Sequence, residues 1–165
     1  MANGDLISPS SDTFDHAEIR DAVLVAFHWY LRSRPIGRVA GMVDCKLSED
    51  TVAWADVSFS FTNADRSIPG RQVPIPFAPD IAVEVLSPPE AAIDVNRKVR
   101  DYLNAGAQEV WLLDGYNGQA AVRTSNAMRV LLRNDILETP LLEGFSLPLA
   151  ELFQRTGDPE TRSSP

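Results

Sequence analysis

The sequence of 165 residues is short of cysteine and histidine, and it lacks long apolar runs. Its one cysteine, Cys45, excludes an internal disulfide framework and a cysteine-based zinc site within one chain. Cys45 follows apolar residues in a predicted strand, so we expect a buried, inert thiol. No apolar run approaches the roughly 20 residues that cross a bilayer. The first residues, MANGDLISPSSD, lack the basic and apolar parts of a secretory signal, so we expect a cytoplasmic protein without a membrane partner.

An excess of basic charge is also missing. The 15 basic residues are outnumbered by 23 acidic ones, which gives a net charge of −8. This balance argues against a broad electrostatic grip on nucleic acid. The motifs GxSxG, GxGxxG, HExxH and the P-loop are absent as well, which disfavours the chemistries that depend on them.

What is present is a series of helix and strand patterns over a length that suits one domain. Apolar residues at helical spacing predict a helix over 16–33, with Asp15 and Glu18 as a capping box. We expect the three tryptophans in the core, and His28 on the helix surface or in the core. The further predicted elements are a strand hairpin over 38–61 with its turn at 48–50, a strand at 80–86, a helix from about 90 to 105, a strand at 109–114, an antiparallel pair formed by AAVRT and MRVLLR, and a helical turn within 147–153. This order predicts a mixed sheet flanked by helices, of α/β or α+β type, in a single domain over 1–153, followed by a polar, disordered tail at 154–165.

The stretch PDIAVEVLSP contains a carboxylate, Glu84, in a strand that reads as apolar on both faces. An ionised carboxylate buried alone is expensive, so Glu84 must be paired, protonated or bound to a metal. Asp80 shares its face but lies roughly 13 Å away along the strand. We therefore expect Asp80 to hydrogen-bond the preceding loop rather than to share a metal ion with Glu84.

Two other residues are candidate partners for Glu84. If the strands that hold Asp56 and Glu84 pair, the two side chains sit about 5 Å apart. Two carboxylates at that separation repel unless a cation lies between them, and a hard ion such as Mg²⁺ suits oxygen ligands. Lys98, at the edge of the following helix, is the alternative. A salt bridge from Lys98 would satisfy Glu84 without any chemistry.

The segments AWADVSF, APDIAVEVLSP and RKVRDYLNAGAQEVWLLD resemble the Uma-type (Uma two) family of restriction-endonuclease-like proteins, in the PD-(D/E)xK nuclease superfamily. The resemblance runs from about Gly4 to Phe153 and includes the LPLAELF ending. It implies a restriction-endonuclease-like fold, a mixed sheet flanked by helices.

Carried over residue by residue, the resemblance implies roles for the carboxylates and the lysine. Asp56 matches the first acidic motif, although Ala55 replaces the usual proline before it. Glu84 matches the second acidic residue, and Leu86 occupies the place of the usual lysine, which Lys98 matches from the helix instead. His16 matches a recurring histidine, for which we expect a local capping or packing role.

The resemblance implies hydrolysis of DNA phosphodiester bonds with Mg²⁺ or Mn²⁺. Asp56, Glu84 and the backbone carbonyl of Val85 would hold the ion, and Lys98 would act on the attacking water. The resemblance also implies a homodimer. Arg97, Arg100, Lys46, Arg66 and Arg71 are the basic residues available for the DNA backbone.

The alternative is a catalytically inactive nuclease fold kept for binding or assembly. Family members usually begin with a glutamate-bearing segment before an Asp-Gly-Glu-Leu-like turn, and this sequence starts at the matching Asn3-Gly4-Asp5-Leu6. The acidic residue of that segment has no counterpart here. This gap and the acidic net charge favour the inactive form, whereas Asp56, Glu84 and Lys98 together favour the nuclease.

Overall fold

The computed structural model describes residues 13–63, 67–68, 70, 73–87 and 92–154. Its elements lie in the order that the sequence patterns predict. They are α1 (Phe14–Ser33), β1 (Gly37–Gly41), β2 (Asp44–Lys46), β3 (Val52–Trp54), β4 (Val57–Phe61), β5 (Ile81–Val85), α2 (Ala92–Asn104), β6 (Glu109–Asp114), β7 (Gln119–Arg123), β8 (Met128–Leu132), β9 (Ile136–Leu137), β10 (Leu147–Pro148) and α3 (Leu149–Phe153). The turn at 3–6 and the predicted tail, apart from Gln154, lie outside the described residues.

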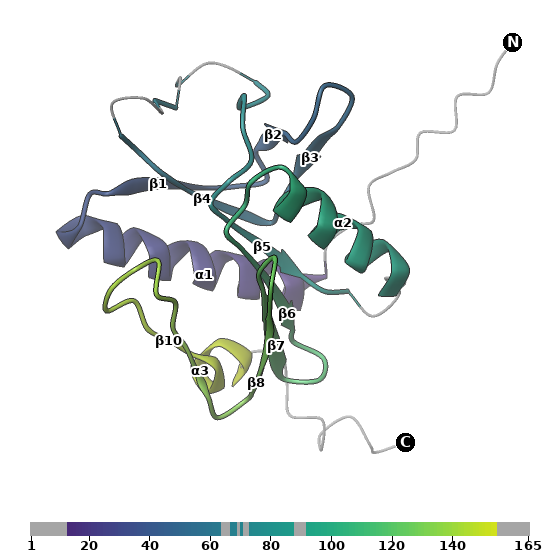
Figure 1. Ribbon diagram of the computed structural model, residues 1–165. Coiled ribbons are helices and arrows are strands. Elements are labelled where there is room, and N and C mark those ends of the chain that lie inside the picture. The colour runs from purple at the N-terminus through teal and green to yellow at the C-terminus, as the bar shows by residue number, and fades with distance from the viewer. Residues whose placement is uncertain (1–12, 64–66, 69, 71–72, 88–91, 155–165) are drawn as a thin grey trace, which may run out of the picture.

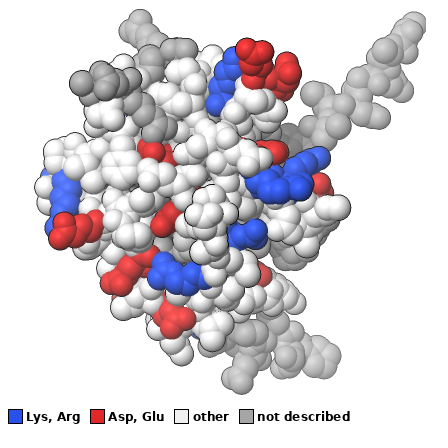
Figure 2. Space-filling model, in the orientation of Figure 1, with Lys and Arg blue, Asp and Glu red and all other residues white. Residues whose placement is uncertain are grey.

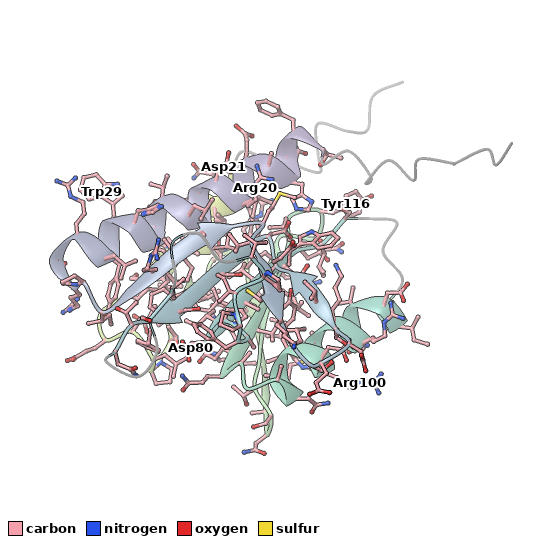
Figure 3. All side chains as sticks on the ribbon, turned by 90° about the horizontal axis from the view of Figure 1, so that it is seen from above. Arg20, Asp21, Trp29, Asp80, Arg100 and Tyr116 are labelled. Atoms are coloured by element: carbon pink, nitrogen blue, oxygen red, sulfur yellow. The ribbon has the colours of Figure 1, made fainter. Side chains whose placement is uncertain are left out.

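Six of the strands form one mixed sheet in the order β1-β4-β5-β6-β7-β8. Only β5 and β6 are parallel, and α2 makes the crossover between them. The helices α1 and α2 cover opposite faces of this sheet (Figures 1 and 3). The predicted mixed sheet flanked by helices is confirmed.

The two faces of β5 separate as the alternation predicts. Ile81, Val83 and Val85 pack into the larger core under α1, which also contains stacked aromatic rings such as Phe27 and Trp111. On the other face, Ala82 packs into a smaller core with α2. All five residues of β5 are buried, including Glu84.

The first helix begins two residues earlier than predicted. Thr13 is its N-cap, and the Thr13 hydroxyl accepts a hydrogen bond from the His16 amide at 3.2 Å. The capping box predicted from Asp15 and Glu18 is therefore wrong, because a threonine just before the helix already accepts from a free amide of the first turn.

The predicted hairpin over 38–61 forms, but a break divides both of its strands. β1 pairs with β4, whereas β2 and β3 form a separate two-stranded sheet. At the break, Met42 has a positive φ of 52°, and its amide points to the carbonyls of both Ala55 and Asp56, at 3.2 and 3.3 Å. Two residues facing one is the pattern of a β-bulge, which bends a strand and turns its side chains. Asp56 therefore lies at a bend and not in a continuous strand.

Two of the three tryptophans contradict the prediction of a core position. Trp111 is fully buried, but Trp29 and Trp54 are 64% and 54% exposed. Trp29 faces outward on α1, where the Arg32 guanidinium lies 4.8 Å from its ring centroid. Cys45 is buried and His28 is exposed, as predicted. Among the described residues, no helix is long and apolar enough to span a membrane.

Candidate active site

Glu84 lies near the end of β5, buried between the sheet and α2. Its Oε2 accepts a hydrogen bond from Lys98 Nζ at 3.2 Å, and the two side chains are 8% and 44% exposed, respectively. The lysine thus reaches the carboxylate from the helix while part of its side chain stays in water. The salt bridge considered from the sequence is present.

The helix that carries Lys98 has a fixed end. The amides of Gly106 and Ala107 bond to the carbonyls of Leu103 and Tyr102, and Gly106 has a φ of 103°. This pair of bonds is the Schellman motif, which needs a residue in the left-handed region and so favours glycine. The chain then turns directly into β6, which pairs with β5 and holds α2 over the face that contains Glu84.

Asp56 reaches the same end of β5 from the bend before β4. Its Oδ2 accepts a hydrogen bond of 2.7 Å from the amide of Val85, the residue next to Glu84. The backbone pairing of β4 with β5 ends at Val57 and Val83. Beyond this point the Val85 amide donates to the side chain of Asp56. The bulge therefore turns this carboxylate toward the strand that holds Glu84, and Asp56 reaches that strand from the bend before β4.

A third residue, His16 of α1, completes the contacts of Asp56. His16 Nε2 lies 3.0 Å from Asp56 Oδ1, and His16 Nδ1 lies 3.2 Å from the hydroxyl of Ser87, two residues beyond Val85. The His16 amide takes part in the cap of α1, but its side chain contacts distant residues and not the local turn, and the predicted packing role stays a prediction. Its partners are 40 and 71 positions away in the sequence, and no local spacing pattern could have indicated them.

Tyr102 of α2 is buried in the smaller core beside Glu84. Burial, followed by the negative charge of Glu84, raises the pKa of this hydroxyl well above its ordinary value, and Asp56 contributes in the same direction. The phenol therefore stays protonated at physiological pH.

The oxygen atoms at this position fit a hard divalent ion. A carboxylate offers about four lone-pair sites, so Asp56 keeps acceptor capacity beyond its bonds to His16 and Val85. Among the described residues, no group of three or more histidine, cysteine, aspartate or glutamate side chains gathers as a metal site. Mg²⁺ does not require one, because it is usually held by one or two carboxylates together with waters and substrate phosphate.

Asp80, at the other end of β5, has a different set of partners. Its Oδ2 accepts from the amide of Phe61 at 2.8 Å, and its Oδ1 accepts from Gln108 Nε2 at 3.1 Å. These bonds tie the end of β4 to the segment before β6. The bonds to β4 and to Gln108 are contacts that the sequence did not predict, and the predicted bond of Asp80 to the preceding loop stays a prediction.

The basic residues expected to contact DNA are scattered. Arg97 pairs with Asp94 at 3.4 Å on the surface of α2, and Arg66 and Arg71 lie outside the described residues. Lys46 is exposed at the end of β2, and Arg100 is exposed on α2 (Figure 3). On the face seen in Figure 2, basic and acidic side chains are interspersed.

A pocket of about 440 Å³ adjoins this end of the sheet. Leu86 and Ser87 contribute to its wall, together with Asn96 of α2 and with Asp114 and Tyr116 at the end of β6. Asp56, Glu84 and Lys98 are not among its lining residues, and Ser87 links the pocket wall to Asp56 only through His16.

Comparisons with known proteins agree with this architecture. The model of the Uma2 family, described as "Putative restriction endonuclease", matches residues 1–150. The crystal structure of "a putative nuclease belonging to DUF820" from Anabaena variabilis ATCC 29413 is similar to the chain, with a TM-score of 0.76 at 21% identity. The similarity covers 92% of this chain and 87% of that one, and at this identity it shows a shared fold. No curated protein matches the chain. Because the family match extends over most of the 165 residues, the chain belongs to the Uma2 family of nuclease-like proteins.

Proposed function

We propose that this protein is a metal-dependent endonuclease that hydrolyses phosphodiester bonds of DNA. The observation that carries the proposal is the contact of 2.7 Å between Asp56 and the Val85 amide, directly beside the Glu84–Lys98 pair. It brings one carboxylate from the bend before β4, one carboxylate from β5 and one lysine from a helix to the same end of β5. The family description supplies the substrate class.

In this proposal Asp56, Glu84 and the backbone carbonyl of Val85 hold Mg²⁺ or Mn²⁺. The bound ion supplies polarisation of the scissile phosphate and an activated water at neutral pH. Both carboxylates are almost fully buried, with Asp56 at 9% and Glu84 at 6% exposure, so their orientation is fixed by protein contacts and not by solvent. A fixed pair of anionic ligands needs little reorganisation when the ion and the substrate bind.

Lys98 has the second role. Its Nζ, as the ammonium group that pairs with Glu84, orients the attacking water and stabilises negative charge on the phosphate. Its side chain is 44% exposed, so a substrate phosphate can approach it without unfolding α2. Glu84 holds the ammonium group at the site until a phosphate competes for it.

The acidic net charge of −8 limits the strength of DNA binding. We therefore propose modest affinity with a strong dependence on salt, or a partner that supplies the DNA contacts. A homodimer and a cytoplasmic location remain predictions from the sequence.

One observation favours a second function, a catalytically inactive nuclease fold used for binding or assembly. The Glu84–Lys98 salt bridge at 3.2 Å already neutralises the buried carboxylate, and His16 and Val85 already donate to Asp56. In this alternative the same contacts serve stability alone. The two functions differ in whether the charge of Glu84 is needed for chemistry.

Cleavage of DNA by the Glu84→Gln variant separates the two functions. High-molecular-weight genomic DNA is the substrate, because it contains short recognition sequences of every kind. With Mg²⁺ or Mn²⁺, the wild-type protein is expected to cleave it and Glu84→Gln to be at least about 100-fold slower. The matched control is Asp80→Asn, which changes a buried carboxylate of the same strand segment and is expected to retain cleavage. A wild-type protein that leaves the DNA intact with both metals would favour the inactive form.

A further inference from the structure

His16 is one of two histidines in the chain, and it is the buried one, at 9% exposure. It extends from the first turn of α1 to two different segments. Its Nε2 contacts Asp56 at 3.0 Å, and its Nδ1 contacts the Ser87 hydroxyl at 3.2 Å. The imidazole thus connects α1, the bend before β4 and the segment after β5.

The chemistry of these contacts selects one arrangement of protons. An ionised carboxylate only accepts hydrogen bonds, so Nε2 must carry the proton that faces Asp56. In a neutral imidazole Nδ1 is then an acceptor, and the Ser87 hydroxyl, which can turn to suit, donates to it. Ser87 therefore favours the tautomer that Asp56 requires.

The two oxygens of Asp56 are held by donors from different parts of the chain. His16 holds Oδ1 at 3.0 Å, and the Val85 amide holds Oδ2 at 2.7 Å. One donor would leave the carboxylate free to rotate about the other bond. Two donors on separate oxygens fix the plane of the group, and each oxygen keeps acceptor capacity for a further ligand.

We propose that His16 is a positioning residue that holds Asp56 in the orientation needed to bind the divalent ion, and that Ser87 supports it by fixing the imidazole tautomer. This inference rests on the proposed function. Hydrogen bonds from outside the ligand set commonly orient metal ligands, and their loss typically lowers metal affinity by about 10- to 100-fold. A histidine that only packed α1 against the sheet would affect folding without affecting metal affinity.

Calorimetric titration with Mn²⁺ tests the inference on four variants. His16→Leu replaces the imidazole by an apolar side chain of similar size without an N–H donor. It is expected to weaken Mn²⁺ binding by about 10- to 100-fold. His16→Gln keeps an N–H donor and is expected to recover part of this loss. Ser87→Ala is expected to have a smaller effect of the same sign. His28→Leu makes the same change at the exposed histidine of α1 and is expected to bind Mn²⁺ like the wild type.

Thermal melting of each variant in a chelator shows whether it is folded, so that a loss of affinity is not confused with unfolding. If His16→Leu does not fold, the comparison of His16→Gln and Ser87→Ala with the wild type carries the test. Wild-type binding that is lost in Asp56→Asn and weakened in the His16 and Ser87 variants supports the proposal.

Two results would overturn it, and they differ in what they imply for the function. Unchanged affinity in the folded His16 and Ser87 variants would show that His16 does not position Asp56, while the proposed metal site would stand. Absence of Mn²⁺ binding by the wild-type protein would remove the metal site itself, and the His16 contact would then be structural.

Discussion

The two ends of β5 each hold a buried carboxylate on the same face of the sheet, but their partners differ. Asp80, 4% exposed, accepts from the Phe61 amide and the Gln108 side chain, which are neutral donors. Glu84, 6% exposed, lies against the charged and half-exposed Lys98. The first arrangement joins strands together, and the second brings opposite charges to a place that substrate can reach.

This difference explains why burial alone does not identify a functional carboxylate. A buried acid held by backbone and amide donors contributes to folding, because removing it leaves buried N–H groups without an acceptor. A buried acid beside a second acid and a lysine is a poor way to gain stability, since ion pairs with an exposed partner contribute little. The proposed metal site would explain why the chain keeps a buried acid beside a second acid and a lysine at the Glu84 end.

The largest effect that we expect at the Glu84 end is the loss of DNA cleavage when Lys98 is replaced. Replacing it by methionine keeps the apolar stem and removes the charge, so we expect DNA cleavage to fall by about 10²- to 10⁴-fold. Stabilisation of the protein by Mg²⁺ should persist, because Glu84 loses a competing cation. Arg32→Met, on the exposed surface of α1, is the control. Equal cleavage by both variants would mean that Lys98 is only a structural partner of Glu84.

Smaller effects are expected on the free energy of unfolding, which a change at Asp80 should lower more than a change at Glu84 does. Asp80→Ala removes the acceptor of the Phe61 amide, and we expect it to lower the free energy of unfolding by about 1–3 kcal/mol in a denaturant titration. Glu84→Gln should cost less than about 1 kcal/mol without metal, because water screens its half-exposed partner. If Glu84→Gln lowered the free energy of unfolding more than Asp80→Ala does, Glu84 and not Asp80 would be the structural carboxylate.

The sequence predicted the features that depend on local patterns. The alternation around Glu84 predicted both faces of β5, and the spacing in the following helix predicted that Lys98 reaches inward. The pairing of 52–61 with 80–86, which the sequence left as a condition, occurs between β4 and β5, although Asp56 itself lies just before β4.

What the sequence did not predict depends on tertiary contacts. The bulge at Met42, which turns Asp56, arises from a single residue with positive φ that is neither glycine nor asparagine. The contacts of His16 with Asp56 and Ser87 form only when α1 packs across the sheet. A histidine in the first turn of a helix carries no pattern that distinguishes this role from a capping role.

The most direct test of the central claim is thermal melting of the wild-type protein and Glu84→Gln with increasing Mg²⁺. At a free concentration of about 100 times Kd, binding stabilises the folded state by about 2.7 kcal/mol. For a domain of this size, that corresponds to a rise in Tm of roughly 5–10 °C. We expect this rise in the wild type and its loss in Glu84→Gln. A wild-type Tm that does not respond to Mg²⁺ or Mn²⁺ would contradict a metal site at Asp56 and Glu84.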